Sequence, residues 1–107
     1  MVEHMTAAEF RESSPKKKQR ELERDVMVLV RDYLGLRGWL VFRHQQSLGS
    51  LKGFPDLTAL KDGVTIYIEC KRGDGKLGAY QKRFRRDCER YGGRYVVARG
   101  IEDLEGL

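Results

Sequence analysis

The sequence has no long hydrophobic run, only two cysteines and only two prolines. No apolar stretch approaches the ~18 residues that a membrane-spanning helix needs. The first residues, MVEHMTAAEF, lack the apolar centre of a secretory signal peptide. Both absences argue against membrane insertion and secretion, so we expect a cytoplasmic protein with no membrane partner. At 107 residues the chain is near the common size of one domain and too short for two independent cores.

The two cysteines, Cys70 and Cys88, do not follow a metal-binding pattern. Neither belongs to a CxxC pair, and each falls within a segment of regular structure predicted below. We interpret both as reduced side chains that behave as small apolar residues. A disulfide bond between them is the alternative.

Positive charge is concentrated in one part of the chain. The sequence has 21 Lys and Arg against 16 Asp and Glu, a net charge of +5. The stretch from Lys71 to Arg90 contains eight bases and three acids, which accounts for the whole excess. Such a concentration favours a polyanionic partner, nucleic acid first and an anionic membrane second. A solvated helix face is the alternative reading.

Residues 1–14 are polar and aperiodic, and we expect them to form a flexible arm. A helix is predicted from Pro15, because Ser14 can cap it and proline is favoured at the first helical position. Its apolar residues recur at the spacing of one helix face, and Gly35 and Gly38 end it. This face comprises Leu22, Val26, Leu29, Val30, Tyr33 and Leu34.

Strands and a second helix are predicted after this first helix. The predicted strands cover residues 39–44, 56–60, 64–71 and 94–99, and the helix covers 79–91. Asp62-Gly63, between the second and third strands, is a strong signal for a hairpin turn. The order α-β-β-β-α-β predicts a single α/β domain over residues 15–107, with a central mixed sheet flanked by helices.

Charged residues occupy strand positions that would otherwise be buried. In the strand 64–71, Glu69 and Lys71 point to one face, and Cys70 points to the other. If the Asp62-Gly63 turn pairs the two strands, Asp56 lies near Glu69 and Lys71. Two adjacent carboxylates repel each other unless a cation lies between them, and hard ions such as Mg²⁺ take oxygen ligands of this kind.

A third acid, Glu23, falls within the apolar face of the first helix, which spans an arc of roughly 160°. A carboxylate there is costly unless it has a partner or a metal ion. One isolated glutamate would be explained by pairing with an arginine or by extension into solvent. Three acids and a lysine on elements that can meet favour a functional site.

Pro55-Asp56, followed after twelve residues by Glu69-Cys70-Lys71, resembles the PD-(D/E)XK nuclease signature. More narrowly, GFPDLTALKDGVTIYIECKRGDGKLGAYQKRF together with LRGWLVFR resembles the VRR-NUC (virus-type replication-repair nuclease) group. The similarity extends from about Glu23 to Val97. It implies a restriction-endonuclease-like fold.

The resemblance also implies a role for each site residue. Asp56 and Glu69 would bind Mg²⁺ or Mn²⁺ together with the backbone carbonyl of Cys70. Glu23 would complete the outer ligand set. Lys71 would orient or activate the attacking water, and Gln81 would line the site. The chain departs from the group at Met27, where many relatives have glutamine.

The helix 79–91 is predicted to be apolar on one side and basic on the other. Tyr80, Phe84, Cys88 and Tyr91 share its expected buried face, and Trp39 and Phe42 are also expected in the core. A basic face can follow a phosphate backbone without reading bases, which predicts structure-selective binding. The residues expected to contact nucleic acid are Arg43, Lys76, Lys82, Arg83, Arg86 and Arg90.

The resemblance implies a metal-dependent DNA endonuclease that acts on branched DNA, including four-way (Holliday) junctions, as a homodimer. A junction has two strands to cut symmetrically, which suits one site per chain in a two-fold dimer. The alternative is a non-catalytic, structure-selective DNA-binding module that uses only the basic helix.

Overall fold

The computed structural model describes residues 15–45 and 51–107 of the chain. The predicted arm, residues 1–14, lies outside the described residues, and so does the predicted cap, Ser14. The elements, in chain order, are α2 (Pro15–Leu36), β1 (Leu40–Arg43), β2 (Leu57–Lys61), β3 (Val64–Cys70), α3 (Ala79–Arg90), β4 (Arg94–Ala98) and the 3₁₀ helix η2 (Ile101–Leu104).

Helix α2 begins at Pro15, as predicted, and ends where glycine allows the chain to turn. Val30 and Leu34 are fully buried, whereas Leu29, predicted on the same face, is exposed. Gly38 has φ +90°, a conformation that favours glycine and commonly follows the last turn of a helix. The Trp39 N–H donates to the Leu34 carbonyl at 3.0 Å, which satisfies one of the last free carbonyls of α2.

The sheet has the order β1-β2-β3-β4. Strands β1 to β3 pair antiparallel, and β4 pairs parallel to β3. Asp62 (φ 53°) and Gly63 (φ 79°) make the β2–β3 turn, and positive φ at both central residues is the type I′ pattern that Asp-Gly favours. A parallel pair needs a long crossover connection, and α3 forms part of it.

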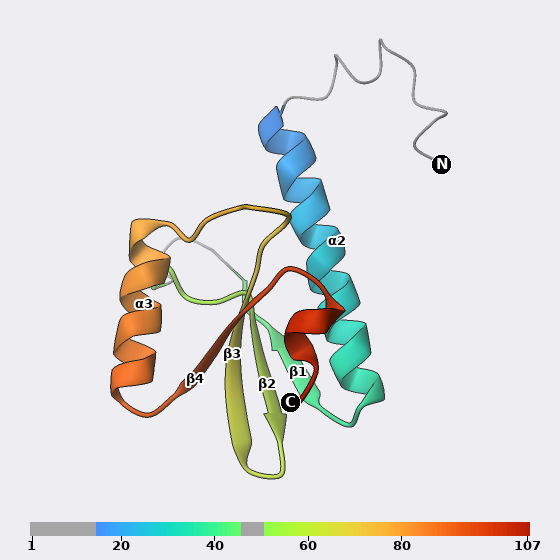
Figure 1. The fold of residues 1–107 in the computed structure, drawn as a ribbon, viewed down its shortest axis with the longest axis vertical. Helices are drawn as coiled ribbons and strands as arrows, with labels where there is room; N and C mark the ends of the chain where they lie inside the picture. Colours follow the sequence, from blue (N-terminus) through green and yellow to red (C-terminus); the bar gives the residue numbers. More distant parts are fainter. Residues whose placement is uncertain (1–14, 46–50) are drawn as a thin grey trace.

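One face of the sheet carries the main core. In Figure 1, α2 and η2 lie on one side of the sheet, and α3 lies on the other. Each leucine or isoleucine that is fully buried contributes roughly 1.5–3 kcal/mol to stability. The core residues are Val30, Leu34, Trp39, Leu57, Ala59, Ile66, Ile68, Cys70, Ala98 and Leu104.

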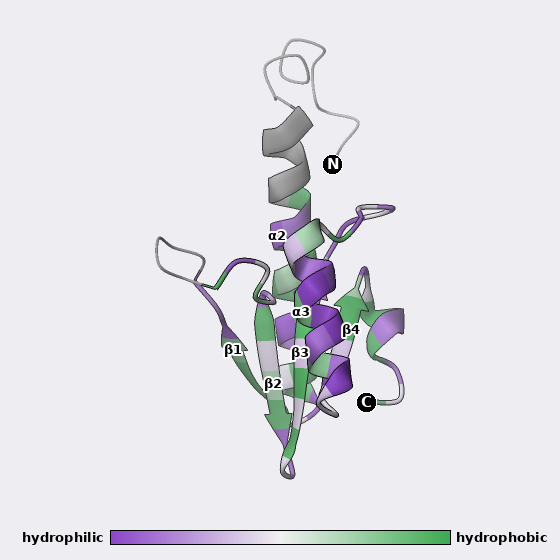
Figure 2. Ribbon diagram, turned by 90° about the vertical axis from the view of Figure 1, so that its left-hand side faces the viewer, coloured by the Kyte–Doolittle hydropathy of each residue, from purple (hydrophilic) through white to green (hydrophobic). Residues whose placement is uncertain are grey.

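Helix α3 packs on the opposite face through aromatic rings. The Phe84 ring is 5.1 Å from that of Phe54, 5.5 Å from that of Tyr67 and 6.1 Å from that of Tyr95, measured between centroids. Phe84 therefore anchors α3 over β3 and β4. Figure 2 shows the helix in front of these two strands, with β1 and β2 to one side of it.

Three predictions about buried aromatic residues were wrong. Tyr80 and Tyr91 are 54% and 87% exposed, because Tyr80 lies beside Lys52 at one end of α3 and Tyr91 follows its last residue. Phe42 is 48% exposed, since it lies on β1, on the part of the sheet that α3 does not cover. Trp39 is buried, as predicted.

The α/β fold class is confirmed, with a four-stranded mixed sheet flanked by helices in the predicted order. Cys70 and Cys88 are both free, which confirms the reduced interpretation. Within the described residues, no helix combines the length and the apolar character needed to cross a membrane.

Candidate active site

The β2–β3 hairpin brings Asp56 to the end of β3. Leu57 pairs with Ile68, so the residue before β2 lies opposite the last residues of β3. The Cys70 backbone N–H donates to Asp56 Oδ2 at 2.8 Å. This hydrogen bond holds the Asp56 carboxylate across the open end of the hairpin.

Glu69, on β3, and Lys71, directly after β3, project to the same side, as the strand alternation predicted. Lys71 Nζ lies 3.5 Å from Glu69 Oε2, and both side chains are largely buried. The same oxygen accepts a hydrogen bond from Gln81 Nε2 at 2.9 Å. Glu69 Oε1 is buried and accepts no hydrogen bond from the part of the chain that the structure describes. Lys71 and Gln81 therefore both hold Glu69 Oε2, and Glu69 Oε1 lies on the side that is not fixed by them.

The charge of Asp56 disfavours the charge of Glu69. Burial and then the negative charge of Asp56 raise the pKa of Glu69 to about 7, although Lys71 opposes the shift. Burial also raises the pKa of Asp56, although the hydrogen bond from Cys70, the charge of Lys71 and a side-chain hydrogen bond with Glu69 oppose the shift. Buried acids with raised pKa values gain stability from a bound cation, so the pair favours a positively charged ligand.

Helix α2 and strand β1 complete the surroundings of Asp56. A hollow of about 230 Å³ is lined by Glu23, Arg24, Met27, Arg43 and Asp56. Glu23 also lies close enough to Glu69 for its charge to raise the pKa of that residue. The three predicted acids therefore come from α2, the start of β2 and the end of β3 to one region.

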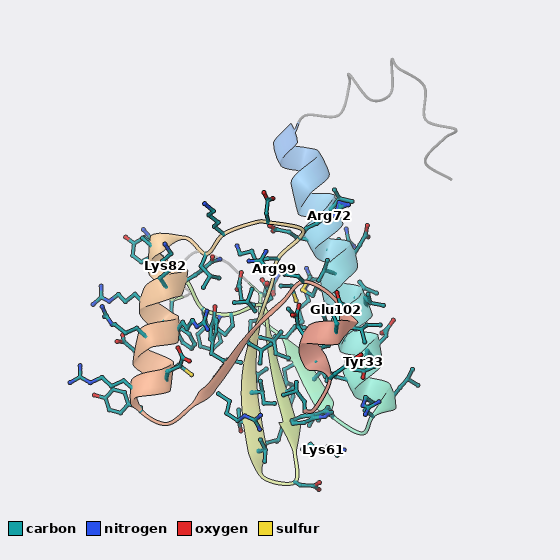
Figure 3. The ribbon with its side chains drawn as sticks, in the orientation of Figure 1. Tyr33, Lys61, Arg72, Lys82, Arg99 and Glu102 are labelled. Atoms are coloured by element: carbon teal, nitrogen blue, oxygen red, sulfur yellow. The ribbon has the colours of Figure 1, made fainter. Side chains whose placement is uncertain are left out.

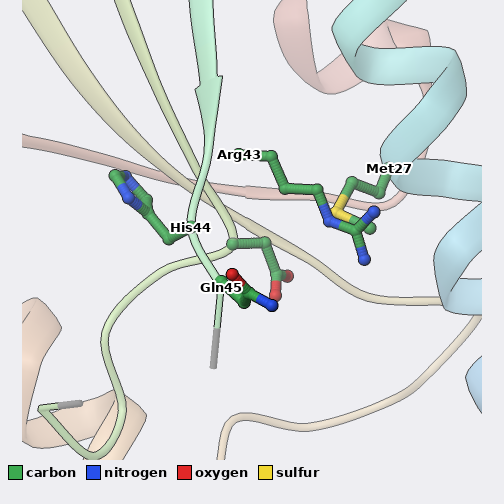
Figure 4. A pocket seen from close by; sticks show the side chains of 5 residues that line it. Met27, Arg43, His44 and Gln45 are labelled. Carbon is green, nitrogen blue, oxygen red and sulfur yellow. The ribbon is translucent and has the colours of Figure 1, made fainter. Parts of the chain in front are cut away.

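A larger hollow of about 530 Å³ adjoins Asp56 and is lined also by Met27, Arg43, His44 and Gln45. Figure 4 shows the Arg43 side chain extending toward Met27, with His44 and Gln45 on the other side of the hollow. Sequence reasoning did not single out Arg24, because it lies about 100° around the helix from Glu23 and therefore outside the apolar face.

The donors at this site fit a hard divalent ion. Among residues 15–45 and 51–107, no three side chains of the types His, Cys, Asp and Glu lie close enough together to hold a metal ion. Mg²⁺ commonly binds through one or two carboxylates and completes its coordination with water and substrate phosphates. Asp56 and Glu69, with the unbonded Glu69 Oε1, match that requirement.

Gln81 connects the site to α3. Its Oε1 accepts a hydrogen bond from the Gly78 N–H at 2.9 Å, which caps the helix. A Cβ atom at Gly53 would lie 2.4 Å from the backbone C and O of Tyr80, so only glycine allows the loop before Asp56 to approach α3 this closely. The first turn of α3 is thus fixed against both the loop and Glu69.

The bases predicted to contact nucleic acid are exposed. Lys82 lies on α3, on the opposite side of the sheet from Tyr33 of α2 (Figure 3). Arg86 pairs with Asp87 at 3.2 Å. The other predicted bases form no ion pair with a described residue. They are Arg43, Lys76, Lys82, Arg83 and Arg90. These positive charges remain available to a polyanion.

The α-β-β-β-α-β order, with acids and a lysine at the open end of the central hairpin, is that of a PD-(D/E)XK-type nuclease. The family model of the archaeal Holliday junction resolvase (Hjc) matches residues 14–83, more than half of the chain. The chain belongs to this family. A comparison with curated proteins found no match. The matched range includes Glu23, Asp56, Glu69, Lys71 and Gln81.

Proposed function

We propose that this chain is a divalent-metal-dependent DNA endonuclease that cuts branched DNA, four-way junctions in particular, and acts as a homodimer. The proposal rests on one observation: the open end of the hairpin brings together Asp56, Glu69 and Lys71. Membership of a family of Holliday junction resolvases supports the substrate class. Within the nucleases, we propose the VRR-NUC type, with residues 15–107 as one domain.

Asp56 and Glu69, with the carbonyl of Cys70, would hold Mg²⁺ or Mn²⁺, and Glu23 would complete the outer ligand set. When bound, the ion polarises the scissile phosphate and lowers the pKa of water. Lys71 supplies a positive charge next to Glu69 that stabilises negative charge developing on the phosphate. Gln81 holds Glu69 Oε2 and so orients the carboxylate.

Hydrolysis in one step by water fits the residues at the site. Cys70 is the thiol closest to the acids in sequence, but burial and the nearby carboxylates raise its pKa to about 12. It is therefore protonated at neutral pH and a poor nucleophile. Its side chain also belongs to the apolar core, on the face away from Glu69. Water, oriented by Lys71, is the proposed nucleophile.

DNA would lie between the hollow at Asp56 and the basic face of α3. Arg43 lines the hollow, and Lys76, Lys82, Arg83 and Arg90 lie on or before α3. These side chains would contact phosphates, which all DNA sequences share. The shape of the DNA would therefore determine which substrate is bound more than its base sequence does.

Cleavage of a labelled four-way junction with Mg²⁺ tests the proposal. We expect the wild type to cut the junction in preference to a linear duplex of the same sequence, and EDTA to abolish cutting. Asp56→Asn and Lys71→Ala should each lower the rate at least about 10³-fold. Asp62→Asn, in the exposed hairpin turn, is the matched control and should cut like the wild type.

Equal cutting by all four proteins would remove the assignment of these residues. Tight junction binding with no cleavage of any DNA form, with or without metal, would instead identify a non-catalytic DNA-binding module.

A further inference from the structure

No helix of residues 15–45 and 51–107 covers one half of the sheet face that carries α3. Leu40 pairs with Leu60, and Phe42 pairs with Thr58, so all four side chains share this face of β1 and β2. Leu40, Phe42 and Leu60 are 55%, 48% and 37% exposed. Figure 2 shows β1 and β2 beside α3 on this face, with no helix in front of them.

We call the residues Leu40, Phe42, Thr58, Leu60 and Thr65 the open-face patch. Thr65 pairs with Leu60 and extends the patch onto β3. Single exposed apolar residues are ordinary, but residues opposite each other on paired strands form one continuous surface. An apolar surface of this kind commonly marks a contact with another molecule.

The composition of the open-face patch excludes DNA as its partner. None of its five residues carries a charge, and DNA binding depends on cations that neutralise phosphates. The bases predicted to contact DNA lie on α3, on the loop before it and at Arg43, at the end of β1. The patch therefore suits an apolar protein surface.

We propose that the open-face patch is the two-fold contact between two copies of this chain. The inference rests on the proposed function, because symmetric cutting of a junction needs two sites and each chain provides one. A two-fold contact uses the same surface on both partners, so it must be complementary to itself. An uncharged apolar patch meets this condition, whereas the basic face of α3 would repel its own copy.

The apolar character of the patch suits the centre of such a contact. A standard interface buries about 800 Å² on each partner and has an apolar centre with a polar rim. Three large apolar side chains on adjacent strands supply the centre. With the two-fold axis along β1 and β2, the Asp56 ends of both hairpins lie at the same end of the dimer, where one junction can reach both.

Sedimentation of the full chain over a range of concentrations tests this contact. We expect the wild type to have twice the mass of one chain. Phe42→Glu and Leu60→Glu should each weaken dimerisation at least about a hundredfold, because each places two like charges at the centre of the contact. Leu36→Glu, at the exposed end of α2, is the matched control and should leave the mass unchanged.

Thermal unfolding distinguishes a variant that has lost the dimer contact from one that has failed to fold. Leu40→Glu changes a side chain that is already more than half exposed in the single chain. We expect it to unfold cooperatively as a monomer. A wild type that remains monomeric at all concentrations would overturn the proposal. This includes the case in which another segment of the same chain covers the patch. A dimer that persists in Phe42→Glu and Leu60→Glu would also overturn it.

The contact and the proposed function can fail separately. A wild type that cuts junctions as a monomer would refute the proposed contact and leave the proposed nuclease activity intact. A wild type that dimerises through the patch but cuts no DNA would refute the proposed nuclease activity and support the proposed contact. If both hold, the monomeric variants should nick one strand of a junction without making the paired cut.

Discussion

Gln81 Nε2 lies 2.9 Å from Glu69 Oε2, while the same amide caps α3 by accepting from the Gly78 N–H. One side chain thus links the start of the basic helix to a buried carboxylate at the proposed metal site. The amide is suited to this place because it both donates and accepts, which neither a carboxylate nor an apolar residue does.

Replacement of Gln81 by glutamate should separate its two contacts. Gln81→Glu keeps an acceptor for Gly78 but removes the donor to Glu69 and adds a negative charge beside it. We expect junction cleavage to fall by roughly 10–100-fold, as for other groups that orient metal ligands, and the Mg²⁺ concentration for half-maximal rate to rise. Near-normal unfolding would show that the cap is intact. Wild-type cleavage by Gln81→Glu would refute the orienting role.

The buried Glu69 should make stability depend on pH. Its pKa is about 7 in the folded chain against 4.5 for the free side chain. Between these values the folded state holds a proton that the unfolded state releases, so stability falls as pH rises through this window. The loss amounts to at most about 3–4 kcal/mol.

Urea unfolding at pH 5 and pH 8 measures this effect. Glu69→Gln cannot titrate at this position, so its stability should change less between the two pH values than that of the wild type. Mg²⁺ at pH 8 should restore part of the lost stability in the wild type only, because it binds the folded carboxylates. Identical pH dependence of the two proteins would contradict the raised pKa.

Gly53 and Gly63 form a matched pair of glycines. Both have positive φ, 80° and 79°, but a Cβ at Gly53 would overlap the backbone of Tyr80, whereas a Cβ at Gly63 would meet nothing within 4 Å. Gly63→Ala should cost about 1 kcal/mol for backbone strain alone. Gly53→Ala should cost at least about 3 kcal/mol, since the overlap displaces α3. Equal losses in denaturant unfolding would show that the close approach is not required.

The basic face of α3 should control the salt dependence of DNA binding. Each lost phosphate contact lowers the slope of log K against log salt concentration by about 0.9. We expect Lys82→Ala and Arg83→Ala each to weaken junction binding and reduce this slope by about 1. Arg31→Ala, on the exposed side of α2, removes the same charge away from α3 and should leave the slope unchanged. If none of the three substitutions changes the slope, DNA does not bind along the basic face of α3.

The central hairpin could be predicted because its signals are local. Alternation along β3 placed Glu69 and Lys71 on one face, and Asp62-Gly63 defined the register that brings Asp56 to them. The apolar face of α2 also indicated that Glu23 points inward. The structure confirms each of these positions, and the roles of the residues stay predictions.

The extent of each buried face could not be predicted in the same way. Periodicity shows which residues share a face but not how far the covering element reaches. Phe42 was expected in the core, yet α3 covers only β3 and β4 on that face. Tyr80 and Tyr91 share a helix face with Phe84, but only Phe84 meets the rings of the sheet.

The close approach at Gly53 has a consequence for the products of the proposed reaction. Backbone touches backbone there, so α3 and the loop that carries Asp56 form one rigid frame. A strand that lies along the helix would meet Asp56 after a constant number of nucleotides. Cut ends should then fall at one set distance from the branch point instead of forming a ladder of lengths.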